Sequence, residues 1–267
     1  MNKLKAGKWS LLYKALPYGA GVLLVRFLLQ SVFNLEVNIG FSDIAEILTA
    51  TTLVVALMLS GVLVDYKESE KIPTIIGRAL ANLDGLSWRG LDVIGQDGKW
   101  ARARVLEIAE AVNLWLTGQI DNEAMWKVQR GGSNIILNLE KSGVRPHYIQ
   151  KMLDVNSDLG SALARIQVVR DTSYIQPGYA LMQMLVGAVM CLMTVVTFPA
   201  SYVEWPITGA LTLLFAYLVL LVQDVDDPFE YSIDGQSTSA ADVDLSPFLT
   251  TLERLRSENS ATRELTF

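Results

Sequence analysis

Four long apolar segments dominate the pattern of hydrophobic and polar positions along this chain. They cover residues 16–35, 44–64, 177–198 and 206–222. The last two contain no charged residue, whereas Arg26 interrupts the first and Glu46 lies near the start of the second. A helix rises about 1.5 Å per residue, so roughly 20 apolar residues cross the hydrocarbon core of a bilayer. The pattern therefore predicts an all-α membrane protein with four transmembrane helices.

The segment between the second and third spans, residues 67–176, has the polar composition of a cytoplasmic helical domain. Amphipathic spacing and helix-terminal residues predict three helices in it, at 99–116, 122–138 and 146–171. Asp121 is placed to cap the second helix, Gly131 to interrupt or kink it, and Pro146 to begin the third. The glycine-rich stretch 85–98 is predicted to be a loop, and no strand is predicted anywhere.

The chain thus divides into four parts. These are an N-terminal flank with the first two spans (1–66), the helical domain (67–176), the last two spans (177–223) and an acidic tail (224–267). The net charge of −6 comes entirely from the tail, which holds 10 acidic and 3 basic residues. We expect this tail to be extended, partly ordered and cytoplasmic. A near-neutral body with an acidic tail also argues against a nucleic-acid partner, which would require a basic surface.

The distribution of Lys and Arg predicts the topology. The N-terminal flank carries Lys3, Lys5, Lys8 and Lys14, while the short connections 36–43 and 199–205 carry no basic residue. Basic residues are retained on the cytoplasmic side, so a multi-pass protein of the cell inner membrane with both termini in the cytoplasm is predicted. A cleaved signal peptide is the alternative, but the first apolar segment is long and no small-x-small cleavage site follows it.

The remaining composition excludes several kinds of chemistry. A single cysteine, Cys191, cannot form an intramolecular disulfide, and a single histidine, His147, leaves no Cys/His metal cluster. The sequence contains no nucleophile elbow, P-loop, zinc-protease or dinucleotide-binding motif. We therefore expect no catalytic residues and predict that the protein is not an enzyme.

Small and polar residues form a stripe along the second span. Thr49, Thr52, Ala56 and Ser60 are spaced by 3, 4 and 4 residues and share one helix face. Such a stripe either packs closely against another helix or lines a water-filled pore between subunits. Both interpretations remain open, and these four residues are the pore-lining candidates.

Arg26 is the intramembrane charge. A charge at this depth costs at least about 2.5 kcal/mol on insertion scales and seldom faces lipid. It could attract anions to a vestibule, pair with a structural partner such as Glu46 or Tyr217, or extend its charged end toward the membrane surface.

An acidic run directly follows the fourth span. Asp224, Asp226, Asp227 and Glu230 supply the oxygen ligands that calcium prefers, although without EF-hand spacing. A solvated acidic run is the alternative interpretation; otherwise no cofactor is expected. Pro228 and Phe229 lie within this run, and because they are apolar we expect them to dock onto the cytoplasmic helices.

This layout resembles the bestrophins, and above all the short bacterial bestrophin-like membrane proteins. The resemblance is carried by Arg165 and Arg170 ahead of Pro177, by the third span, and by the Asp226-Asp227-Pro228-Phe229 turn. It implies a homo-oligomer, pentameric as in that family, that conducts anions such as chloride. It also implies that the second span lines the pore and that a calcium site follows the fourth span.

We therefore predict an oligomeric, bestrophin-like channel for inorganic ions, passive and with a slight preference for anions. Its partners would be the lipid bilayer, further copies of the same chain and the ions themselves. The alternative function is a non-conducting membrane scaffold or signalling protein that recruits a partner through its cytoplasmic domain and acidic tail.

Overall fold

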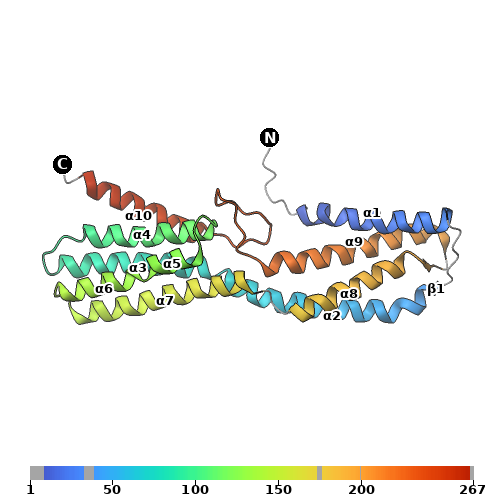
Figure 1. Cartoon of the computed structure of the whole chain (residues 1–267), viewed down its shortest axis with the longest axis horizontal. Coiled ribbons are helices and arrows are strands. Elements are labelled where there is room, and N and C mark those ends of the chain that lie inside the picture. Colours follow the sequence, from blue (N-terminus) through green and yellow to red (C-terminus); the bar gives the residue numbers. More distant parts are fainter. Residues whose placement is uncertain (1–8, 33–38, 173–175, 199, 265–267) are drawn as a thin grey trace. The chain divides into compact units, whose positions relative to one another are not determined.

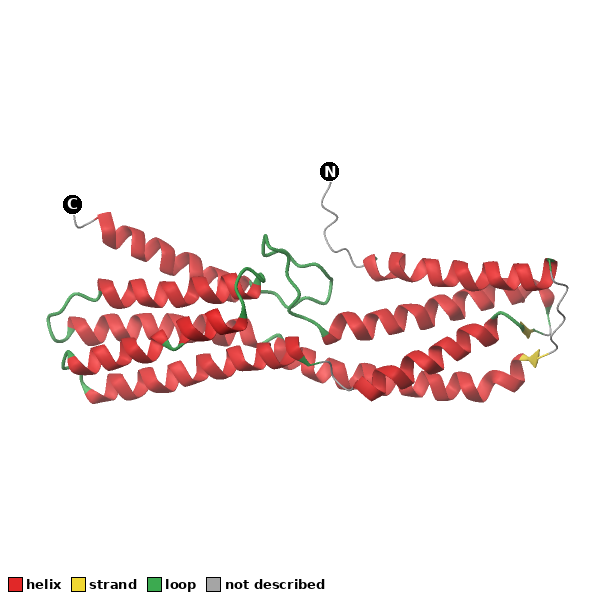
Figure 2. Ribbon diagram, viewed as in Figure 1, coloured by secondary structure: helices red, strands yellow, loops and turns green. Residues whose placement is uncertain are grey.

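The computed structural model of the chain describes residues 9–32, 39–172, 176–198 and 200–264. The chain folds into two compact units (Figures 1 and 2). The membrane unit comprises residues 1–66, 173–228 and 239–241, and the helical unit comprises 67–172, 229–238 and 242–267.

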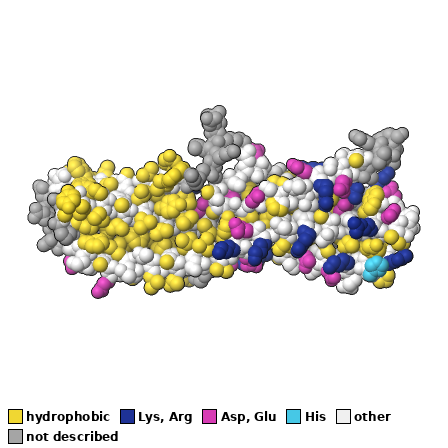
Figure 3. All heavy atoms as spheres, turned by 180° about the vertical axis from the view of Figure 1, so that it is seen from behind, with side chains coloured by type: hydrophobic (Ala, Val, Ile, Leu, Met, Phe, Trp, Pro, Cys, Tyr) yellow, Lys and Arg dark blue, Asp and Glu magenta, His cyan; other side chains and the backbone are white. Residues whose placement is uncertain are grey.

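The membrane unit is built from four helices, each long and apolar enough to cross a bilayer. They are α1 (Ser10–Ser31), α2 (Phe41–Ser69), α8 (Gln176–Met193) and α9 (Ser201–Asp226). The four predicted spans are therefore confirmed, although α1 begins six residues before the predicted start and contains Pro17 in its interior. On the face shown in Figure 3, apolar side chains predominate on this unit, whereas most of the charged side chains lie on the helical unit.

The core of the membrane unit is formed by apolar residues of α2, α8 and α9. Its most buried members include Val55, Val62, Met182, Val189, Met193 and Val222. Helices α1 and α9 lie in close contact where each carries a glycine, and Gly209 is at the tighter of the two positions. A Cβ at Gly19 would lie 3.8 Å from Leu213 Cβ, and one at Gly209 would lie 3.3 Å from Leu23 Cδ1. Small residues of this kind allow membrane helices to approach within van der Waals contact of their backbones.

Two short strands join the connections that the sequence assigns to the outer side. The strands β1 (Ile39–Gly40) and β2 (Val196–Thr197) pair in parallel, with Ile39 opposite Val196. The Thr197 hydroxyl also donates to the Ile39 carbonyl at 3.1 Å. The expectation of no strand was therefore wrong. Both connections lie at the same end of the membrane unit, as the predicted topology requires.

The helical unit contains six helices. They are α3 (Ile72–Asp92), α4 (Lys99–Leu116), α5 (Asn122–Gln129), α6 (Gly131–Lys141), α7 (Pro146–Asp171) and α10 (Ser246–Glu264). The bounds of α4 and α7 agree with the prediction. The Asp121 carboxylate accepts a hydrogen bond from the Ala124 amide at 2.8 Å, and the predicted helix over 122–138 is divided in two ahead of Gly131.

The glycine-rich stretch 85–98 is mostly helical, contrary to the prediction. Helix α3 continues through Gly85 and Gly90 to Asp92. Gly90 is required for packing, because a Cβ there would lie 2.8 Å from Val144 Cγ1. A turn forms only afterwards, where Gly95 has a φ of 71°. Glycine in this stretch therefore serves close packing as well as chain reversal.

The end of the chain is folded, although it was expected to be extended. After a short loop in which the Tyr231 hydroxyl donates to the Val243 carbonyl at 2.6 Å, α10 packs against α3 and α4. Phe248, Leu252 and Leu255 are its buried residues. These side chains are spaced by 4 and 3 residues, so they form one apolar face that packs into the helical unit.

Candidate functional site: the exposed face of α2 and the intramembrane ion pair

The stripe of small and polar residues on α2 is exposed in the single chain. Thr49, Thr52, Ala56 and Ser60 all lie on the solvent-accessible face of α2. The opposite face carries Val55, Met58 and Val62, which are buried in the core of the membrane unit. Packing against a neighbouring helix of the same chain therefore does not account for the stripe.

The two threonine hydroxyl groups of the stripe are satisfied within the helix. Thr49 Oγ1 donates to the Ala45 carbonyl and Thr52 Oγ1 donates to the Leu48 carbonyl, both at 2.8 Å. Since the hydroxyl protons are used in this way, each hydroxyl oxygen keeps lone pairs that face outward. The two threonines can therefore offer acceptors to water or ions while their own donors stay paired.

A groove of about 650 Å³ runs beside the stripe. Three residues of the stripe share its lining with Phe41, Leu53, Leu211, Leu214 and Phe215, among others. Leu53 and Leu57 on α2 are themselves well exposed. A polar stripe bordered by exposed leucines and an apolar groove can either contact another copy of the chain or form a narrow apolar passage.

Arg26 is fully buried in the membrane unit, with an exposed fraction of 0%. Its guanidinium donates to Glu204 Oε2 at 3.0 Å, to the Met193 carbonyl at 3.1 Å and to Thr208 Oγ1 at 3.4 Å. The guanidinium is therefore enclosed by α8 and α9, and these partners do not include Glu46 or Tyr217. It has a structural partner, as one of the interpretations proposed, but that partner is Glu204.

Glu204 links Arg26 to the start of α2. Its second oxygen, Oε1, accepts a hydrogen bond from the Phe198 amide at 3.1 Å. The Phe198 ring stacks on Phe41, the first residue of α2, with a centroid separation of 5.1 Å. The buried ion pair thus positions the segment that holds the start of α2. Sequence reasoning missed Glu204, although it is the only charged residue in 177–223.

The acidic run begins in the last turn of α9, with Asp224 and Asp226, and continues into the following loop. Across the part of the chain that the structure describes, no three His, Cys, Asp or Glu side chains come together to hold a metal ion. Asp224 accepts a hydrogen bond from Ser239 Oγ, Asp226 is a hydrogen-bonding partner of the Tyr179 hydroxyl, and Asp227 and Glu230 are exposed. Calcium binding by the four carboxylates stays a prediction.

Pro228 and Phe229, which interrupt the acidic run, are both buried. Phe229 has an exposed fraction of 0% and belongs to the helical unit. Of the two arginines that precede the third span, Arg165 pairs with Glu68 at 2.8 Å, and Arg170 donates to the Trp115 carbonyl at 3.2 Å. Both arginines therefore hold helices of this unit together.

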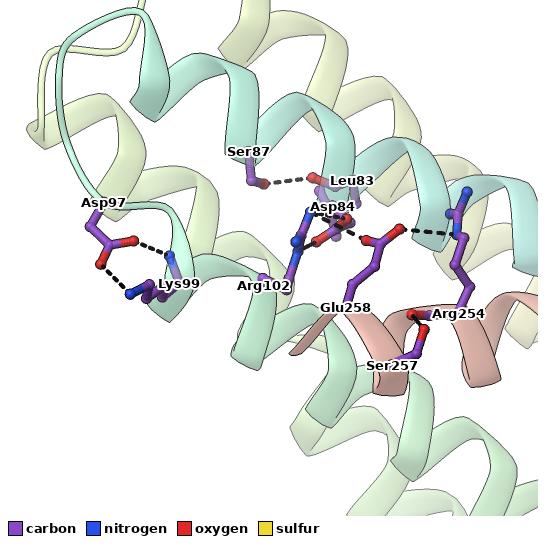
Figure 4. Close-up of polar contacts among 9 residues, drawn as sticks. All are labelled: Leu83, Asp84, Ser87, Asp97, Lys99, Arg102, Arg254, Ser257 and Glu258. Atoms are coloured by element: carbon purple, nitrogen blue, oxygen red, sulfur yellow. Dashed lines mark hydrogen bonds and ion pairs between the residues drawn. The ribbon is translucent and has the colours of Figure 1, made fainter. Parts of the chain in front are cut away.

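A second charged cluster, also missed from the sequence, joins α3, α4 and α10 (Figure 4). Arg102 donates from two nitrogens to the two oxygens of Asp84, at 3.1 and 3.2 Å. The same guanidinium lies 3.3 Å from Glu258 Oε2 on α10 and 4.4 Å from the centroid of the Trp88 ring. This cluster fixes the C-terminal helix but contains no group arranged for catalysis.

Comparisons with known proteins give results only at the level of structure. No family model matches the chain and no curated protein sequence matches it. Among solved structures, the bacterial bestrophin homologue from Klebsiella pneumoniae, phased by zinc SAD, matches with a TM-score of 0.70 at 13% identity, covering 94% of this chain and 98% of that chain. A variant of the homologue matches with a TM-score of 0.73 at 13% identity, covering 94% and 99%. A crystal structure of a membrane protein variant gives the same values.

Proposed function

The chain has a bestrophin-like fold and is a multi-pass membrane protein, and on that premise we propose that it is one subunit of an oligomeric, passive ion channel. The proposal places it in the cell inner membrane with both termini in the cytoplasm, and assigns anions a slight preference. The observation that carries the proposal is the exposed polar face of α2, formed by Thr49, Thr52, Ala56 and Ser60.

Lipid offers nothing to the remaining lone pairs of the threonine hydroxyl oxygens, whereas water and ions can use them. If copies of the chain surround an axis, the face can instead meet water and ions. Exposed leucines beside the stripe, Leu53 and Leu57, would narrow the passage and allow it to close by dewetting. A pentamer, which the resemblance implies, provides such an axis.

The charges near this face determine which ions enter. Arg26 does not contribute an uncompensated positive charge, because Glu204 pairs with it. Glu46 is exposed and lies three residues before Thr49 on the same face. The anion preference is therefore supported by the likeness in fold alone. Glu46 opposes this preference, because its negative charge attracts cations.

Cysteine accessibility tests whether the face meets water. Thr52→Cys and Ser60→Cys, each combined with Cys191→Ser, are reconstituted in liposomes and treated with a charged, membrane-impermeant thiol reagent. We expect rapid labelling that changes ion flux. Met184→Cys in the same background is the matched control, since Met184 is also exposed but lies on α8; it should remain unlabelled in lipid. Unlabelled sites on α2, in liposomes that stay tight to chloride and sodium, would instead favour the non-conducting scaffold.

A further inference from the structure

The helical unit contains a cavity that the channel proposal does not use. It has a volume of about 730 Å³ and lies where α4, α5 and α6 converge. Its size falls within the range of roughly 300–1,000 Å³ found for small-molecule sites. The polar residues in its lining are Trp100, Arg104, Glu107, Lys127, Asn134 and Asn138.

The apolar part of the lining is formed by the inner faces of the helices. Ile108 of α4 and Ile135 of α6 are almost fully buried and make up part of the wall. Trp100 is 37% exposed and presents a large aromatic surface to the same cavity. A ligand with an apolar or planar body could therefore be removed from water here.

The charged residues of the lining carry a net positive charge. Arg104 pairs with Glu107 at 2.6 Å, so these two charges offset each other. Lys127 makes no ion pair with any residue that the structure describes. One positive charge therefore remains in the cavity lining.

The neutral polar groups also lack protein partners. The indoles of Trp115 and Trp126 donate to Asn122 and Gln167, at 2.7 and 2.6 Å. Within the described ranges, neither the Trp100 indole nor the carboxamides of Asn134 and Asn138 make such a hydrogen bond. Ammonium, indole and carboxamide groups together supply more donors than acceptors. The lining is therefore suited to a ligand that accepts hydrogen bonds and carries negative charge.

We propose that this cavity binds a small organic anion. The carboxylate or phosphate group of the ligand lies at Lys127 and the two asparagines, where charge-assisted hydrogen bonds form. Its apolar or planar body lies against Trp100 and the partly exposed Ala124 and Val128. This binding site is independent of ion conduction through the membrane unit.

Equilibrium dialysis of the full-length protein in nanodiscs tests this proposal with four probes. Indole-3-acetate and adenosine monophosphate have a planar body with a carboxylate or a phosphate, tryptamine has the indole body with an ammonium, and inorganic phosphate has no apolar body. We expect saturable binding of at least one of the two organic anions, and much weaker binding of tryptamine and phosphate. Equal binding of tryptamine and indole-3-acetate, or binding of neither organic anion, would overturn the proposal.

Variants then locate the site. Lys127→Gln should weaken binding of the organic anion about tenfold, because a charge-assisted hydrogen bond is lost. Lys141→Gln is the matched control, as it removes an exposed charge of α6 outside the cavity lining and should leave binding unchanged. A Cβ at Gly131 would meet no atom within 4 Å, so a side chain can start there, and Gly131→Leu adds bulk to the lining.

We expect Gly131→Leu to abolish binding without lowering the thermal midpoint of the protein. If the thermal midpoint of Gly131→Leu falls, the test rests on Lys127→Gln alone, provided that the thermal midpoint of that variant is unchanged. Retention of full affinity in Lys127→Gln would show that the anion binds elsewhere.

Discussion

Arg26 and Glu204 form an ion pair inside the membrane unit, with the arginine fully buried and the glutamate side chain 16% exposed. Removal of one partner leaves the other charge uncompensated, which typically costs about 3–5 kcal/mol for a buried pair. We therefore expect Arg26→Met to lower the free energy of unfolding by about 3 kcal/mol, the lower end of that range, because Glu204 retains some access to water. The measurement is denaturant unfolding in detergent. The double variant Arg26→Met/Glu204→Leu should recover most of the loss, and an equally unstable double variant would contradict the pairing argument.

Neutralising Glu46 should change ion selectivity. Glu46→Gln removes an exposed negative charge from the face that we propose lines the pore, so the chloride-to-sodium permeability ratio should rise. Bilayer recordings of reversal potential under a salt gradient measure this ratio. Glu140→Gln removes an exposed charge from α6 and serves as the control. A ratio that does not change, in a protein that still conducts, would place the ion path away from this end of α2.

Phe229 should contribute strongly to stability, because its ring is fully buried. We expect Phe229→Ala to reduce the free energy of unfolding by about 3 kcal/mol. Ile233 is 75% exposed in the same loop region, so Ile233→Ala should have almost no effect. Thermal unfolding of the two variants side by side gives the comparison, and equal midpoints would show that the buried ring makes no net contribution.

The two carboxylates that contact Arg102 should differ in importance. Asp84 has a side chain that is 5% exposed and binds the guanidinium with both oxygens, whereas Glu258 is 37% exposed. We expect Asp84→Ala to cost about 3 kcal/mol and Glu258→Ala less than about 1 kcal/mol. Urea unfolding followed by circular dichroism measures both variants. If Glu258→Ala is the more damaging, α10 is held mainly by its ion pair, and the apolar contacts of Phe248 and Leu252 matter less.

Acid should weaken the start of α10. Asp244 accepts hydrogen bonds from the amide and hydroxyl of Ser246, and these lower the pKa of its carboxyl. Because the folded-state pKa is depressed, this stabilisation is present above the unfolded pKa of about 3.9 and is lost as the pH falls through the folded-state value. Asp244→Asn should therefore be less stable than the parent at pH 7, and the difference should shrink below about pH 4. Thermal midpoints of both proteins across this range test the effect; a constant difference would contradict it.

The parts of the fold that depend on local sequence were predictable. The four spans follow from hydropathy, and α7 follows from Pro146 at its start, because these properties are set by neighbouring residues. The apolar residues of α10, Phe248, Leu252 and Leu255, have helical spacing too, but the surrounding acidic and hydroxyl residues suggested an extended tail. Burial of that face requires α3 and α4, which are far away in the sequence.

The candidate site shows the same division. The stripe from Thr49 to Ser60 is a local pattern and was found, whereas the partner of Arg26 was not. The sequence suggested Glu46 and Tyr217 as partners and did not suggest Glu204, because hydropathy does not reveal which helices lie next to each other. The pairing of β1 with β2 was also missed. Each strand has only two residues, too few for an alternation of polar and apolar positions to be detected.

The ion pair between Arg26 and Glu204 also has a consequence for biogenesis. The two residues are 178 positions apart in the chain, and ribosomes add about 5–20 residues per second. The first hairpin of spans therefore waits roughly 10–35 seconds before its counter-charge is synthesised. During this interval the carboxylate that pairs with Arg26 in the folded chain does not yet exist. The ion pair can therefore form only after the second hairpin of spans has been synthesised.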